Sequence, residues 1–364
     1  MRKAWVVSAF LLLFIDRAAV HAAAADSRET PEKSLGEAYS VLSGDRLLNP
    51  QPTDKTVLLE ALFKLKSLAH PVSTKPSGPK VDGALPFVTL NPPQVLGRLD
   101  THFQKGNFVQ SAAGIRRIMQ ICTECHAKST KPNWPMIGPN TGLTLIEYAD
   151  FFKLVGRSND ALLYYEKILT KKGAASERPD IWERAATNVV ALGIETAGSA
   201  YTFVDVLSNL LQETSISKKQ RDMVTSWRTQ GKAWGLERTL PSKPSELLEH
   251  ARMLTSMGDN NNKALITSGL VAYARALMEL KKVGIYGSTD QKTKAFLMMG
   301  EVREKLTVPG VWLQPEDYYE ACIRSAPHSQ EAARCWNLLT TLSARDPKFV
   351  LAGDTNQQLQ ALLH

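Results

Sequence analysis

Apolar residues recur at spacings of three and four along almost the whole of this chain, whereas few stretches alternate apolar and polar residues. The first spacing places apolar side chains on one face of an α-helix, and strict alternation would indicate a strand. In the first third of the chain this pattern predicts helices at residues 31–43, 54–69, 94–105 and 108–128. We therefore predict an all-α protein.

Two segments rich in helix-breaking residues divide the chain. Residues 71–92 are rich in proline, glycine and serine, and residues 131–142 read KPNWPMIGPNTG. Such clusters are typical of loops and linkers. The second one separates a predicted N-terminal helical bundle, residues 26–142, from a longer helical unit at 143–345, which is followed by a C-terminal tail at 346–364.

Residues 145–169 resemble a tetratricopeptide repeat, which is a pair of antiparallel helices of about 34 residues. The resemblance rests on small, aromatic and turn residues at the expected offsets, namely Ala149, Phe152, Gly156, Ala161 and Tyr165. Leu145 stands in place of the usual tryptophan.

A second, looser match covers residues 294–329 and has a longer loop between its helices. Its matching positions are Gly300, Tyr319, Cys322 and Pro327. The two matches imply an irregular TPR-like α-solenoid over residues 143–345, and such repeats present extended concave surfaces to protein partners. A plain helical domain with coincidental small residues is the alternative.

The first 25 residues are similar to a secretory signal peptide. A short basic start precedes an apolar run at residues 4–15, and small residues follow as far as Ala25. This order predicts export to the periplasm, with cleavage after Ala22 or Ala25. The apolar run is shorter than the roughly 20 residues that span a bilayer, and no other run is longer, so we expect no transmembrane segment in the mature chain.

The formal net charge of +8 is spread along the chain and is not gathered in one stripe. Its basic pairs are Arg116-Arg117, Lys171-Lys172, Lys218-Lys219 and Lys281-Lys282. We interpret these pairs as solvated helix faces and expect no nucleic-acid partner.

The sequence MQICTECHAKST contains Cys122, Cys125 and His126 in the spacing Cys-x-x-Cys-His. On a helix these three side chains share one face. The motif resembles the attachment site of c-type cytochromes, in which two thiols bind the haem covalently and the histidine is the proximal iron ligand. The resemblance implies one covalent haem c, attached outside the cytoplasm.

Other chemistries use similar residues. A structural zinc site needs further ligands with suitable spacing, and a redox dithiol needs a βαβ setting, neither of which this sequence offers. A plain disulfide beside a histidine is a further alternative. Haem attachment explains the complete motif.

The position of the motif, last in a four-helix unit, resembles the class II, c-prime-like cytochromes, in which the haem lies within a helical bundle. Six-coordinate members of that group use a methionine on their first helix, and this chain has none between Met1 and Met119. Met136 and His102 are the candidate distal ligands, with His70 as another, and an open distal site is the alternative.

The other two cysteines, Cys322 and Cys335, flank a helix break at residues 327–329. Across an antiparallel hairpin they come within bridging distance, so we predict a structural disulfide in an oxidising compartment. His250 and His328 stand alone, and no catalytic arrangement can be inferred.

These observations predict an exported monohaem c-type cytochrome that transfers electrons and docks a redox partner or another periplasmic protein through its helical repeats. Two alternatives stay open. One is a TPR-like scaffold or adaptor with haem as a sensor, and the other is a gas-binding haem protein with an open distal site.

Overall fold

The computed structural model describes residues 55–69, 143–154, 157–237, 241–264, 267–306, 315–345 and 353–363, together with Thr53 and isolated positions between 99 and 115. Throughout these residues the regular elements are helices and no strand occurs, so the predicted all-α class is confirmed. The helices are α4 (Lys55–Ala69), α7 (Leu145–Leu154), α8 (Ser158–Leu169), α9 (Ala174–Glu177), α10 (Pro179–Ala197), α11 (Tyr201–Leu210), α12 (Lys218–Gly235), α13 (Pro244–Ala264), α14 (Leu270–Tyr286), α15 (Thr289–Lys305), α16 (Pro315–Ser325), α17 (Gln330–Arg345) and α18 (Gly353–Ala361).

Local sequence signals set several helix ends. Ser217 accepts a hydrogen bond from the backbone N–H of Gln220, whose side chain accepts one from the Ser217 N–H in return. Ser288 and Gln291 form the same reciprocal cap at the start of α15. These capping boxes satisfy backbone donors that would otherwise lack partners at a helix start.

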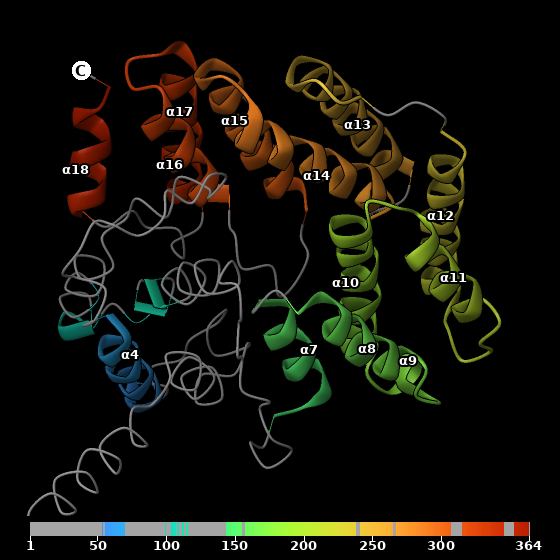
Figure 1. Cartoon of the computed structure of the whole chain (residues 1–364). Helices are drawn as coiled ribbons and strands as arrows, with labels where there is room; N and C mark the ends of the chain where they lie inside the picture. The colour runs from blue at the N-terminus through green and yellow to red at the C-terminus, as the bar shows by residue number, and fades with distance from the viewer. Residues whose placement is uncertain are drawn as a thin grey trace, which may run out of the picture.

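Helices that follow one another in the chain pack side by side. Helix α7 packs on α8, α8 on α10, and α10 on α14, while α13, α14, α15, α16 and α17 form a second series of neighbours. Figure 1 shows the two series meeting where α10 stands against α14. Whether these hairpins constitute a tetratricopeptide-like solenoid stays a prediction.

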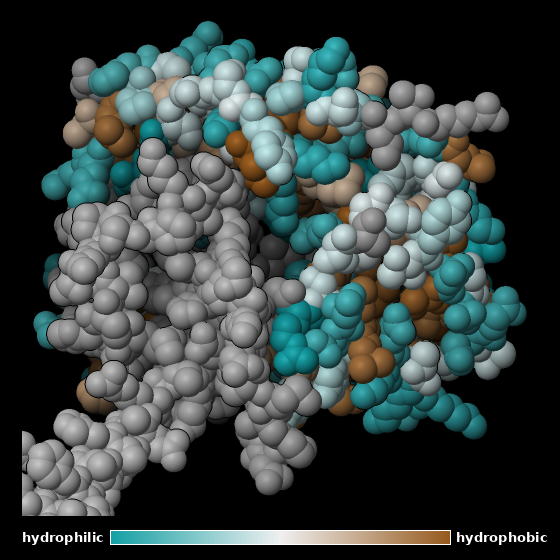
Figure 2. Space-filling view, viewed as in Figure 1, coloured by the Kyte–Doolittle hydropathy of each residue, from teal (hydrophilic) through white to brown (hydrophobic). Residues whose placement is uncertain are grey.

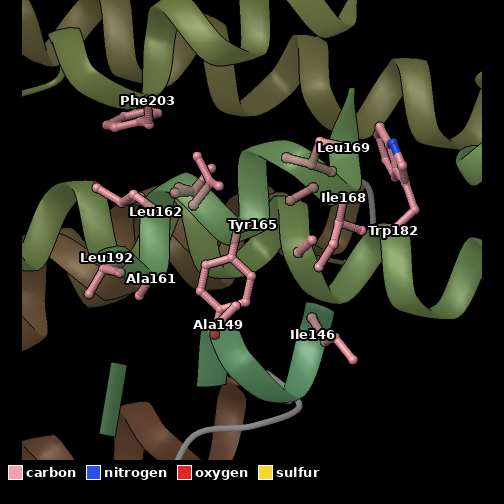
Figure 3. Packing of buried hydrophobic residues seen from close by; sticks show 14 of the residues in the cluster. Ile146, Ala149, Ala161, Leu162, Tyr165, Ile168, Leu169, Trp182, Leu192 and Phe203 are labelled. Atoms are coloured by element: carbon pink, nitrogen blue, oxygen red, sulfur yellow. The ribbon is translucent and has the colours of Figure 1, made fainter. Parts of the chain in front are cut away.

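The first predicted repeat unit is a pair of packed helices, α7 and α8. Ala149, Ala161 and Tyr165 are fully buried there, and Phe152 is almost so. Figure 3 shows the Tyr165 ring pointing from α8 toward Ala149 of α7. A small residue at 149 leaves room for this ring, which explains why a small and an aromatic residue occupy these offsets.

The second predicted repeat unit has a similar close approach. A Cβ atom at Gly300 would lie 2.3 Å from Cε1 of Tyr319, so the absence of a side chain on α15 allows the tyrosine ring of α16 to pack directly against the helix. Tyr319 is fully buried and donates a hydrogen bond to Glu304. The ring therefore has little freedom to move.

Two hydrophobic clusters form the described core. The first contains residues from Leu58 to Ala274, with Trp182 and Trp227 among its fully buried side chains. The second runs from Leu247 to Leu359. On the face in Figure 2, hydrophobic residues reach the described surface in small patches among hydrophilic ones.

The end of the chain, where the sequence suggests only a tail, contains helix α18. Its Leu359 is fully buried in the second cluster, and the helix contacts α16. The buried Leu359 side chain therefore attaches α18 to the second cluster. None of the helices in the described part of the chain is long and apolar enough to cross a membrane.

Candidate functional site

The predicted haem-attachment residues Cys122, Cys125 and His126 lie outside the described residues, as do the candidate distal ligands Met136 and His102. Upstream in the same predicted helix, residues 108, 111, 112, 114 and 115 are described and helical. Ala112 and Ile115 are fully buried in the first hydrophobic cluster.

The structure joins Cys322 of α16 to Cys335 of α17 by a disulfide, with 6.4 Å between the two Cα atoms. The turn between these helices includes His328, which has a φ of 66°. Both sulfurs are buried in the second cluster. The bond therefore links the two helices of one hairpin, and neither cysteine has a free thiol.

Four charged residues from four helices come together between α7, α10, α14 and α15, and we call them the Glu195 cluster. They are Lys153, Glu195, Lys281 and Arg303. Nζ of Lys281 lies 3.4 Å from Oε2 of Glu195, and Nη2 of Arg303 lies 3.6 Å from its Oε1. Lys153 interacts electrostatically with the same carboxylate.

The helix ends explain part of this arrangement. Glu195 lies in the last turn of α10, where the helix dipole disfavours a negative charge. Lys153 and Arg303 lie in the last turns of α7 and α15, where the dipole favours positive charge. Cations from neighbouring helices therefore stabilise the Glu195 carboxylate, and two of them, Lys153 and Arg303, come from the ends of α7 and α15.

The cluster perturbs the pKa values of its members. Burial alone would raise the pKa of Glu195, but Lys281, Arg303 and Lys153 together hold it down at about 2. Burial lowers the pKa of Lys153 to about 8, helped by Arg303 and Lys281 and opposed by Glu195. The Glu195 carboxylate raises the pKa of Lys281. At neutral pH Glu195 is therefore ionised, and Lys153 is still mostly protonated.

A second buried ion pair lies beside the cluster on the same face of α10. Arg184 donates a hydrogen bond to Asp150, which also accepts one of 2.6 Å from the hydroxyl of Tyr165. Asn188, one turn beyond Arg184, accepts a hydrogen bond of 2.6 Å from Nζ of Lys153. Asn188 thus connects the α10 face to the Glu195 cluster.

Sequence reasoning missed the Glu195 cluster, and it was wrong to interpret Lys281 as part of a solvated helix face. Lys281 turns inward toward Glu195, whereas its neighbour Lys282 is exposed. The only available signal was a single acidic residue near the end of the largely apolar run VVALGIETA. That signal does not identify the partners, which come from other helices.

His250, which appears isolated in the sequence, has a buried partner. Its Nδ1 lies 2.9 Å from both carboxylate oxygens of Glu279 on the neighbouring helix α14. Burial raises the pKa of Glu279, and His250 opposes this. The two residues are 29 positions apart, so only the pairing of α13 with α14 brings them together.

A polar groove of about 560 Å³ lies between α13, α15 and α17. Its charged lining consists of Arg252, Asp259, Lys294, Glu301, Glu331 and Arg334. These charges balance, and two pairs close on each other, Arg334 with Glu301 and Lys294 with Glu331. The groove therefore has no surplus charge to hold a charged ligand.

Within the described residues, no three His, Cys, Asp or Glu side chains gather in a way that could hold a metal ion. Comparison with protein-family models, curated proteins and solved structures finds no match for this chain. What the structure defines is an all-α protein of packed helical hairpins with a partly buried, net positive charge cluster.

Proposed function

We propose that this chain is an exported monohaem c-type cytochrome that transfers electrons. The observation that carries the proposal is the sequence Cys122-x-x-Cys125-His126, placed behind a segment that resembles a signal peptide. The buried helical positions Ala112 and Ile115, just upstream, support a packed helical setting for the motif.

In this proposal Cys122 and Cys125 hold the haem through thioether bonds, and His126 binds its iron. The haem supplies one-electron chemistry, with a potential that axial ligation and burial adjust. Because all three side chains share one face of the predicted helix, a single helix turn presents both thiols and the imidazole. The helical hairpins of residues 143–345 dock the electron-transfer partner.

The decisive experiment is pyridine haemochrome analysis of the exported full chain. We expect one covalently held haem c per chain, because both cysteines add to the haem. The Cys122→Ala/Cys125→Ala variant is expected to lose the haem, and Cys322→Ala/Cys335→Ala is the matched control that keeps it. Haem that acid-acetone removes from the wild type, or no haem at all, contradicts the proposal.

The gas-binding alternative is distinguished by the distal ligand. If Met136 is the sixth ligand, the ferric protein is low-spin and Met136→Ala opens the iron to carbon monoxide. A low-spin spectrum that survives Met136→Ala and disappears in His102→Ala indicates bis-histidine ligation instead. A high-spin wild type that binds carbon monoxide favours the open-site alternative.

A further inference from the structure

The Glu195 cluster contains more positive than negative charge. Lys153, Lys281 and Arg303 surround one carboxylate, so the group carries a surplus of two positive charges when all members are ionised. The neighbouring pair of Arg184 and Asp150 is balanced and does not change this surplus. Like charges held together in a partly buried site repel one another, because the surrounding protein screens them less than water does.

The cluster also has unused hydrogen-bond donors. Arg303 is only 8% exposed, and its buried Nε has no hydrogen-bond partner. A buried donor without a partner is costly to a folded protein, so such groups call for an explanation. The two lysine ammonium groups each offer three donors, and the described contacts use one at Lys153 and one at Lys281.

The cluster is partly exposed to solvent. The side chain of Lys281 is 34% exposed and that of Glu195 is 19% exposed, whereas Arg303 lies deeper. A small ion can therefore approach past Lys281 toward the arginine. A guanidinium and ammonium groups presented together are the usual means by which proteins bind phosphate-like oxyanions.

We propose that the Glu195 cluster is a binding site for a small dianion of the phosphate class, held by Lys153, Lys281 and Arg303. A dianion neutralises the surplus of two positive charges, whereas a monoanion leaves one positive charge uncompensated. Glu195 repels the ligand and so limits its affinity, while it holds Lys281 and Arg303 in place when the site is empty.

The test is isothermal titration of the full chain with inorganic phosphate at pH 7 and constant ionic strength. We expect saturable binding at one site and weak or absent binding of the monoanion nitrate. Lys281→Met removes one charged donor and is expected to weaken phosphate binding roughly tenfold or more. Lys282→Met, the exposed neighbour on α14, is the matched control and leaves the affinity unchanged.

A further variant separates binding from a structural effect. Glu195→Gln removes the repelling carboxylate, so phosphate is expected to bind more tightly even though the variant is less stable. Lys281→Arg keeps the charge and is expected to retain binding. Should any of these variants fail to fold, the wild type still provides the test, because phosphate is expected to raise its Tm by mass action and nitrate is not.

Three results overturn the proposal: no saturable phosphate binding by the wild type, equal binding of nitrate, or equal weakening by Lys281→Met and Lys282→Met. Binding of succinate without binding of phosphate overturns the phosphate assignment. The site is independent of the proposed haem, so the Cys122→Ala/Cys125→Ala full chain is expected to give the same titration whatever the outcome of the haemochrome analysis.

Discussion

Glu195→Gln is the most informative single change to the stability of this protein. The pKa of Glu195 falls from its ordinary 4.5 to about 2 in the folded chain. Since a pKa difference of one is worth 1.36 kcal/mol, this difference corresponds to about 3 kcal/mol of stability at neutral pH. A similar figure applies to breaking other partly buried ion pairs, because the cations lose a neighbouring negative charge that offset the cost of burying them.

The assay is urea denaturation of the full chain at pH 7, monitored by circular dichroism. We expect the free energy of unfolding to fall by about 3 kcal/mol in Glu195→Gln. Glu183→Gln is the matched control on the same helix, because Glu183 pairs with Lys219 at 3.4 Å on the surface. Surface pairs contribute less than about 1 kcal/mol, so the control is expected to change little.

The pH dependence gives a second, independent readout. The folded-state pKa of Glu195 lies below its unfolded value, so its contribution is complete above pH 4.5 and is lost as the pH falls toward 2. The difference in stability between wild type and Glu195→Gln is therefore expected to shrink to about half at pH 3.

Two outcomes refute the reasoning. If Glu183→Gln destabilises the protein as much as Glu195→Gln does, the partly buried position of the Glu195 cluster is not the cause. If the difference between wild type and Glu195→Gln stays constant from pH 7 to pH 3, the carboxylate charge is not what the neighbouring cations stabilise.

Three further predictions concern other parts of the molecule. Because the folded-state pKa of Lys153 is about 8 and its ordinary value is 10.5, the unfolded chain binds more protons between these values. The free energy of unfolding is therefore expected to rise with pH between these values. Lys153→Met is expected to reduce that rise in denaturation experiments at several pH values. The same pH dependence in the variant and the wild type would contradict this prediction. Gly300→Ala forces a Cβ to within 2.3 Å of a buried ring and is expected to lower stability by about 1–3 kcal/mol in urea denaturation. The control, Gly235→Ala, has its nearest atom at 3.9 Å and is expected to be neutral or slightly stabilising; equal losses would contradict the packing argument. Mass spectrometry of unreduced peptides is expected to find Cys322 joined to Cys335, and opening this loop is expected to lower stability by about 3 kcal/mol, whereas free thiols at both positions would exclude the bond.

The sequence by itself determined the helical class and many helix ends. Apolar residues at spacings of three and four predict an amphipathic helix, because residues three or four positions apart lie on the same face of a helix. The predicted hairpin at residues 145–169 corresponds to α7, which ends at Leu154, and α8, which begins at Ser158. The capping residues Ser217 and Ser288 act within three positions, so their role is also local.

Only the tertiary structure decided which helices meet and what their charged side chains do there. Lys153, Glu195, Lys281 and Arg303 come from four helices, and helical periodicity gives each residue a face without identifying the neighbour of that face. Sequence spacing alone does not distinguish an exposed lysine from one that faces a neighbouring helix. For this reason the sequence did not reveal the role of Lys281. The energy of an ion pair depends on how deeply it is buried and on which residues surround it. Those residues are distant in sequence, so the order of residues along the chain does not specify them.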